Sequence, residues 1–191
     1  MTIRSATLLL SIVLASPALA HTGPTAFHGF GSGLLHPLLG LDHVLAMVAV
    51  GLWAGLAGGR ALWAWPAAFV AVMAAAAYLG TSGIAMPGIE PTIALSVLVF
   101  GVGVAVRREA AMGVGVALCG LFASAHGYAH GAELPPGHSA PEYFAGFVLA
   151  TLALHGIGLA LGDVFGRTDR PWLPELTGGA VAAGGLALLV S

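Results

Sequence analysis

Long apolar stretches separated by short polar breaks run along almost the whole chain. Nearly all of the turn-forming residues stand in these breaks, which read GGR, MPGIEP, RRE, HGAELPPGHSAPE and GRTDRPW. A helix of about 20 apolar residues is long enough to cross the hydrocarbon core of a bilayer. The pattern therefore predicts an all-α membrane protein with six transmembrane helices, over residues 31–57, 62–84, 91–106, 110–130, 142–165 and 174–190.

Residues 1–20 have the order of a secretory signal peptide. Arg4 precedes the apolar run ATLLLSIVLA, and a helix-breaking proline and the small residues ALA follow it. An uncleaved first membrane helix is the alternative, but the apolar run is short for a span. We expect cleavage after Ala20, which leaves residues 21–191 as a single membrane domain. His21 would then be the new N-terminus, where its amine and imidazole either bind a metal ion together or form a solvated end.

The composition also indicates a chain that lies mostly in lipid. Only 7% of the residues are charged and 58% are hydrophobic, whereas a soluble domain carries about 25% charged residues. The sequence has no basic patch that would favour nucleic-acid binding. It has no lysine, which excludes a phosphate-loop lysine and Schiff-base catalysis, and its one cysteine, Cys119, cannot form an intrachain disulfide. We expect a membrane protein that is not an enzyme.

The arginines predict how the helices are oriented. If the mature N-terminus lies outside, then Arg60, the pair at 107–108, Arg167 and Arg170 all fall on the inner side. Positively charged residues collect on the cytoplasmic side of membrane proteins, so the arginines and the signal peptide agree. We expect a bacterial inner-membrane protein with both termini in the periplasm. An aromatic belt near the inner ends of the spans would be formed by four tryptophans: Trp53, Trp63, Trp65 and Trp172.

Pairs of glycines four residues apart predict close helix packing, because small residues at this spacing let two backbones approach. The pairs are Gly51 with Gly55, Gly55 with Gly59, and Gly158 with Gly162. Histidines occur in both the first and the fourth predicted span. Such a loose correspondence between the two halves of the chain is typical of the inverted repeats of transporters.

Ionisable residues inside the predicted spans are the main functional signal. In HPLLGLDHVLAM, His36 and His43 are seven residues apart, nearly two helical turns, so both would lie on one helix face. Asp42 would point about 100° away from that face. It could orient a neighbouring imidazole, or bind a metal directly if Pro37 and Gly40 distort the helix. A carboxylate beside two imidazoles is costly in lipid and therefore marks a site or a path.

Two further spans contain histidines. The segment HGYAHGAE places His126 and His130 one turn apart, a spacing at which two histidines can bind one metal ion, and Glu133 follows three residues later. His155 stands alone in its span, where a hydrogen bond between helices is the more usual role of a histidine. At about 1.5 Å per residue, His43 and His155 both lie near the membrane midplane.

These side chains indicate a divalent transition metal. Imidazole and carboxylate suit nickel, cobalt, zinc or copper, whereas calcium and magnesium prefer cages of oxygen atoms. The histidines run from the outer surface to the midplane, and none lies in the predicted inner half. Glu90, in an outer loop, either gathers cations at the mouth or is a solvated acid. We expect an importer in which Glu133 helps to attract the ion and His43, Asp42 and His155 hold it near the midplane.

Three segments of the chain resemble one family. HPLLGLDHVLAMVAVGLWA, FASAHGYAHGAELP and GFVLATLALHGIGLALG are similar to the HupE/UreJ proteins, bacterial membrane proteins encoded with hydrogenase or urease genes. The resemblance implies uptake of Ni²⁺ for the assembly of nickel enzymes, and it does not distinguish Ni²⁺ from Co²⁺. We expect no permanent cofactor, and metal-delivery proteins are candidate partners. The family's motifs fall on six residues: His36, Asp42, His43, His126, His130 and Glu133.

Three other functions stay open. A membrane haem protein could use His43 and His155 as axial ligands, and its Soret absorption would reveal it. An intramembrane hydrolase could use Ser82 or Ser124 with a histidine, although no carboxylate is obviously placed to complete a triad. A metal-storing or metal-sensing membrane protein would bind the same ions without moving them across the membrane.

Overall fold

The structure is a computed structural model, and it describes residues 29–106 and 110–191. In these two ranges the chain is entirely helical, without β-strands, which confirms the all-α class. The signal peptide, His21 and the arginines at 107–108 lie outside the described residues. The helices are α2 (Phe30–Leu39), α3 (Leu41–Ala57), α4 (Ala61–Gly80), α5 (Ile89–Ala105), α6 (Met112–Ala132), α7 (Ala140–Gly166) and α8 (Trp172–Val190).

Four of the described helices, α4, α6, α7 and α8, are long and apolar enough to cross a membrane. The helices α2 and α3 form a fifth candidate together, but they meet at an angle of 85°. The remaining helix, α5, is apolar and has 17 residues. The predicted span 31–57 is therefore divided in two. Gly40 separates the halves with φ −90° and ψ 113°, which is extended backbone rather than helix.

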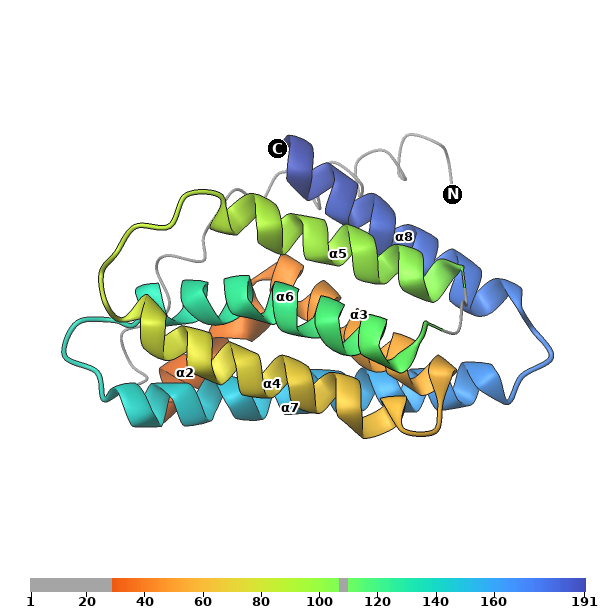
Figure 1. The fold of residues 1–191 in the computed structure, drawn as a ribbon, viewed down its shortest axis with the longest axis horizontal. Helices are drawn as coiled ribbons and strands as arrows, with labels where there is room; N and C mark the ends of the chain where they lie inside the picture. The colour runs from red at the N-terminus through yellow and green to blue at the C-terminus, as the bar shows by residue number, and fades with distance from the viewer. Residues whose placement is uncertain (1–28, 107–109) are drawn as a thin grey trace, which may run out of the picture.

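Helices far apart in the sequence pack side by side through glycines (Figure 1). α3 lies along α7, where a β-carbon at Gly51 would collide with the carbonyl of His155 and one at Gly158 with the carbonyl of Val48. α4 lies along α6 and α5 along α8 in the same way. The prediction of close packing at Gly51, Gly55, Gly158 and Gly162 is confirmed. It is wrong for Gly59, which follows α3 in a turn with φ +54° and has no neighbour within 4 Å of a β-carbon.

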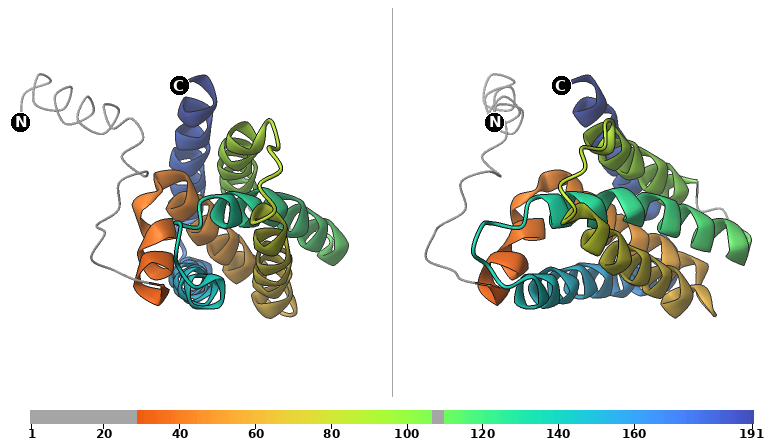
Figure 2. Two further views of the ribbon diagram at one scale, coloured as in Figure 1. Left: turned by 90° about the vertical axis from the view of Figure 1, so that its left-hand side faces the viewer. Right: turned by 60° about the vertical axis from the view of Figure 1, so that its left-hand side comes forward.

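The helix pair α5 and α8 lies on one side of the bundle, above α3 and α6 in Figure 1, and Figure 2 shows the same arrangement from two other directions. The core between the helices contains large side chains that are almost completely buried, among them Met47, Phe69 and Phe100. Trp53 and Trp65 also belong to this core, with ring centroids 4.6 Å apart. The aromatic-belt prediction is wrong for these two tryptophans, because glycines on neighbouring helices leave room for their rings inside the bundle.

The connections between helices gather at two ends of the molecule (Figure 1). The α4–α5 and α6–α7 loops lie at one end, and the α3–α4 and α7–α8 connections lie at the other. The second pair of connections contains Arg60, Arg167 and Arg170, whereas the first pair contains His138 and leads into α5 at Glu90. The grouping of arginines that the sequence predicted is thus present for the arginines that the structure describes.

Candidate metal-binding site

The break at Gly40 brings the polar end of α3 back toward α2. Pro37 lies inside the last turn of α2 and has no backbone N–H to offer, so the helical hydrogen-bond pattern is already weakened there. A β-carbon at Gly40 would lie 2.8 Å from Asp42 Oδ1 and 3.0 Å from His43 Nδ1. The 2.8 Å contact is shorter than real β-carbons make, so glycine at position 40 lets the Asp42–His43 pair lie against the break.

Four imidazoles from α2, α3 and α6 meet beside this break. We call them the histidine cluster: His36, His43, His126 and His130. The His130 ring centroid is 4.9 Å from that of His36 and 4.7 Å from that of His43, and His126 is 4.7 Å from His43. His43, His126 and His130 are buried. The prediction that His36 and His43 share one helix face is wrong. The two residues lie on helices that meet at 85°, and their ring centroids are 6.3 Å apart.

A carboxylate adjoins the cluster at each of two positions. Asp42 Oδ1 lies 2.8 Å from His43 Nδ1 and also accepts the backbone N–H of His43 at 2.7 Å. Glu133, at the end of α6, places Oε2 2.8 Å from His36 Nε2. A carboxylate that accepts one ring N–H fixes the orientation of the imidazole and makes its other nitrogen a better ligand. The contact between Asp42 and an imidazole, which the sequence predicted as one alternative, is present.

A serine partner determines the tautomer of His126. Ser96 donates its hydroxyl proton to the carbonyl of Ile93 at 2.6 Å, so its oxygen accepts the Nε2–H of His126 at 2.9 Å. His126 Nδ1 then carries a lone pair. By the same reasoning the bond from His43 Nδ1–H to Asp42 leaves the lone pair of His43 on Nε2. Ser96 is fully buried on α5 and was missed by the sequence, because a single serine in an apolar helix carries no signal of its own.

Several nitrogens of the cluster have no hydrogen-bond partner among the described residues. They are His43 Nε2, His126 Nδ1 and both ring nitrogens of His130. More than nine in ten buried polar groups in proteins are hydrogen bonded, so unpartnered buried nitrogens are unusual and are available to a ligand. Within residues 29–106 and 110–191, however, no three histidine, cysteine, aspartate or glutamate side chains are already arranged to hold a metal ion. The rings pack edge to face against one another and must rotate apart to admit an ion.

His155 lies apart from the cluster, on α7, with 1% of its surface exposed. The ring of Phe69 separates them, with its centroid 5.5 Å from that of His126 and 5.2 Å from that of His155. Both ring nitrogens of His155 also lack a partner among the described residues. The predicted bond from His155 to another helix is thus not formed in this part of the chain. A haem between His43 and His155 would have to displace Phe69 and the packed imidazoles.

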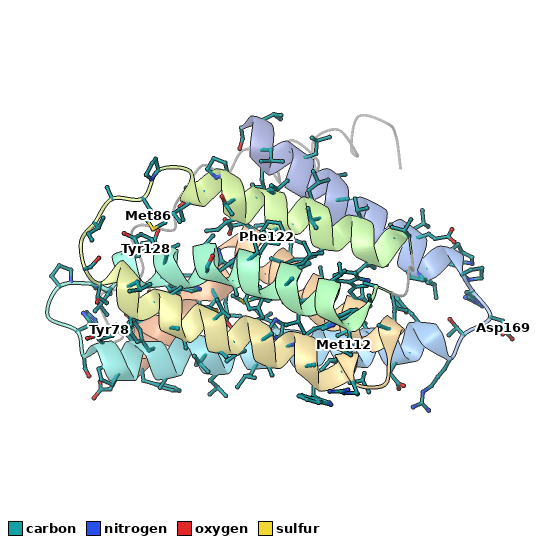
Figure 3. All side chains as sticks on the ribbon, in the orientation of Figure 1. Tyr78, Met86, Met112, Phe122, Tyr128 and Asp169 are labelled. Atoms are coloured by element: carbon teal, nitrogen blue, oxygen red, sulfur yellow. The ribbon has the colours of Figure 1, made fainter. Side chains whose placement is uncertain are left out.

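A cavity of about 570 Å³ lies beside the cluster at the end of the bundle that contains the α4–α5 loop. Glu90 and Glu133 both line it, together with Met86 and Tyr128, which are labelled at this end in Figure 3. Glu133 therefore borders the cavity and contacts His36 as well. None of the four histidines of the cluster is among the residues that line the cavity.

The serines considered for hydrolysis have other contacts. Ser124 is exposed and donates its hydroxyl to the carbonyl of Leu121 in its own helix at 2.6 Å. Ser82 is exposed in the α4–α5 loop, where its oxygen accepts the N–H of Ile84 at 3.4 Å. These are hydrogen bonds within a loop and within a helix, and they do not form the serine–histidine pair of a nucleophilic enzyme.

Comparisons with known proteins give one consistent result. Residues 8–188 match the family described as HupE / UreJ protein. A curated relative, Protein HupE of Rhizobium leguminosarum bv. viciae, is 46% identical over 185 residues, which cover 96% of this chain and 96% of the relative. No solved structure matches the chain.

Proposed function

Because this chain belongs to the HupE/UreJ family, which is associated with nickel and cobalt transport for hydrogenase and urease, we propose that it is a permease that imports a divalent transition metal. The proposed cargo is Ni²⁺. Co²⁺ is the expected competitor, because the ligands of the proposed site suit both ions. The imported ion would serve the maturation of a nickel enzyme such as hydrogenase or urease. The ion is the substrate, and no permanent cofactor is proposed.

The histidine cluster is the observation that carries this proposal. It combines four imidazoles and two carboxylates with unpartnered nitrogen atoms in the interior of an apolar bundle. Ionisable groups in such a setting are expensive and typically line the path of an ion. Their chemistry favours nickel and cobalt over calcium and magnesium. Since the rings must rotate to admit an ion, binding would be weak enough to allow release, as conduction requires.

We propose a route that begins at the acidic cavity. Glu90 and Glu133 attract the hydrated ion, and His36 and His130 receive it next. His43 and His126 then hold it, with Asp42 orienting His43. His155, beyond Phe69, is the deepest station of this route. His21 would assist at the outer surface, outside the described residues.

The proposed topology has six spans in the bacterial inner membrane after a signal peptide cleaved at Ala20. The pair α2 and α3 forms one broken span, α5 forms a short span, and α4, α6, α7 and α8 form the others. Discontinuous helices are a recurring device at the binding sites of transporters. The end with Arg60, Arg167 and Arg170 would face the cytoplasm, following the positive-inside rule. The cavity and both termini would then face the periplasm.

Uptake of radioactive nickel at low external concentration tests this function, in cells with and without the protein. We expect accumulation far beyond the amount of protein present, because a permease turns over whereas a storage protein or sensor holds only a few ions per chain. Cobalt is expected to compete more strongly than zinc or copper. Nickel that remains stoichiometric with the protein would reject transport and favour the storage alternative.

Single histidine variants test the site within the same assay. His36→Ala and His43→Ala are expected to lose most of the uptake at normal expression, because each removes an imidazole from the cluster. His138→Ala is the control, since this histidine lies in the α6–α7 loop and outside the cluster. Uptake at the parent level in both cluster variants would show that the ion takes another route.

A further inference from the structure

Two methionine sulfurs meet one hydroxyl deep in the bundle. Thr151 Oγ1 lies 3.3 Å from Met47 Sδ and 3.7 Å from Met73 Sδ. The three residues come from α3, α4 and α7, and all are completely buried. A threonine hydroxyl has a single proton, so it can donate to only one sulfur at a time. At any moment, therefore, one of the two thioether sulfurs accepts no hydrogen bond from Thr151.

Met47 and Thr151 lie between His43 and His155, and Met73 packs against Gly127, the neighbour of His126 in the cluster. Met47 follows His43 by one turn of α3, and Thr151 precedes His155 by one turn of α7. The two helices run side by side in the same direction, since Gly51 meets His155 four residues beyond the contact of Met47 with Thr151. His155, with two unpartnered ring nitrogens and 1% exposure, lies at the next level.

The ligand atoms that these three residues offer differ from those of the histidine cluster. The cluster above offers imidazoles and carboxylates, which suit borderline divalent ions, whereas a thioether is a soft, neutral ligand that prefers ions such as Cu⁺ and Ag⁺. A neutral site attracts Ni²⁺ less strongly than a site with carboxylates. An ion that leaves the cluster would therefore be passed on rather than trapped. Methionine is also a flexible side chain that adapts its sulfur position at little cost.

We propose that Met47, Met73 and Thr151 form a second metal site, beside the histidine cluster and one helical turn beyond His43. This thioether–hydroxyl site binds soft monovalent transition-metal cations, and Ni²⁺ crosses it between His43 and His155. The second part of the inference rests on the proposed nickel transport, whereas the first part does not.

Silver binding tests the site without reference to transport. The full chain is purified in detergent with Cys119→Ala as the background, because a thiol would bind Ag⁺ by itself. Bound silver is counted by equilibrium dialysis, and its neighbours are identified by X-ray absorption at the silver edge. The double variant Met47→Leu/Met73→Leu is expected to bind one Ag⁺ fewer per chain and to lose the sulfur neighbours. Leucine replaces methionine with little change of volume, which protects the fold.

A control removes another methionine of the described residues. Met112 lies at the start of α6, at the opposite end of that helix from His126 and His130, and it is labelled in Figure 3. Met112→Leu is expected to bind silver like the background protein. Thr151→Val retains both sulfurs and is expected to weaken silver binding several-fold. Equal silver stoichiometry and equal sulfur neighbours in the Met47/Met73 double variant would overturn the proposed site.

Nickel uptake tests the second part. Met47→Leu/Met73→Leu is expected to slow the initial rate of nickel uptake several-fold, while Met112→Leu leaves it unchanged. If silver binding is lost but nickel uptake stays at the parent rate, nickel does not pass through these thioethers. If the parent itself accumulates no nickel, the proposed transport fails, and the silver result still decides whether the site exists.

Discussion

Asp42 uses one oxygen for two contacts with His43, one to the ring and one to the backbone. This geometry favours a positioning role, because the carboxylate holds the imidazole that the ion meets. We predict that Asp42→Ala weakens nickel uptake by about 10–100-fold in apparent affinity, as expected for loss of a carboxylate behind a metal-binding histidine. Asp42→Asn keeps an oxygen acceptor for Nδ1–H and is expected to lose less. The concentration dependence of nickel uptake measures both effects.

Asp163→Asn is the control for the two Asp42 variants, since Asp163 forms an exposed ion pair with Arg167 far along α7. A positioning role for Asp42 requires that the asparagine variant clearly outperform the alanine variant. Equal and severe losses would instead indicate that the negative charge itself binds the ion.

Ser96 provides a second prediction at this scale. Its oxygen accepts the Nε2–H of His126 inside the bundle, so Ser96→Ala leaves a buried N–H without that partner. Bonds of this kind between membrane helices contribute about 0.6 kcal/mol on average and up to about 1.7 kcal/mol. We expect a small fall in thermal stability in detergent and a larger, several-fold fall in nickel uptake, because the tautomer of His126 is no longer fixed.

Ser124→Ala is the matched control, because Ser124 is exposed and its hydroxyl donates to the carbonyl of Leu121 in its own helix. Uptake that falls equally in the Ser96 and Ser124 variants would show that His126 does not depend on Ser96.

Side-chain chemistry determined which members of the site were visible in the sequence. His36, Asp42, His43 and Glu133 could be identified because ionisable residues are rare and costly in lipid. Phe69, Ser96, Met73 and Thr151 could not, since each is an ordinary residue in an apolar helix. They acquire a role only through partners on other helices, and a single sequence does not show which helices are neighbours.

At the scale of the helices, the contact between α3 and α7 depends on glycine. A β-carbon at Gly158 would lie 2.2 Å from the carbonyl oxygen of Val48, so Gly158→Ala must push the two helices apart. Overpacking of this kind typically costs about 1–3 kcal/mol. We predict a lower thermal transition in detergent and reduced nickel uptake, because α3 contributes His43 and α7 contributes His155.

Gly156→Ala is an unusually close control, two residues away on the same helix. Its β-carbon would meet nothing within 4 Å, so the stability of this variant is expected to equal or exceed that of the parent. The packing explanation requires the two variants to differ, and equal transitions would reject it.

The bend between α2 and α3 is a feature that helical periodicity does not predict. Pro37 and Gly40 mark a weak point in the sequence, but the seven-residue spacing places His36 and His43 on one face only if the helix is continuous. The 85° break between the two helices brings the ring centroids of His36 and His43 to 6.3 Å. Depth estimates that count 1.5 Å per residue share this weakness, because they treat the first span as straight.

Gly40→Ala tests the importance of the bend. A methyl group there would contact Asp42 Oδ1 and His43 Nδ1 at 3.0 Å or less, so we predict displacement of this pair and a large loss of nickel uptake with the helical content unchanged. Circular dichroism of the purified variant measures helix, and the uptake assay measures function. Normal uptake would mean that the Asp42–His43 pair tolerates movement.

At the scale of the whole molecule, the helix directions support six spans. α3 and α7 run in the same direction, as do α4 and α6, where Gly127 meets Met73 and Gly131 meets Ala77. α5 and α8 run in opposite directions, since Gly101 meets Ala182 and Gly178 meets Ala105. Six alternating spans with α5 as the third require these relative directions. The pairing of α4 with α6 and of α7 with α3 is also what an inverted relation between the two halves would produce.

Reporter fusions test this topology directly, and α5 is the decisive element. Its 17 residues rise about 25 Å at 1.5 Å per residue, less than the full thickness of about 30 Å of the hydrocarbon core, so its status as a span depends on local thinning or on its neighbours. We predict that alkaline phosphatase fused after Ala85 is active, after Ala110 inactive, after Asp169 inactive and after Ser191 active. Activity of a fusion indicates the periplasm. If the Ala85 and Ala110 fusions report the same side, α5 does not cross the membrane, and the proposed periplasmic C-terminus fails with it.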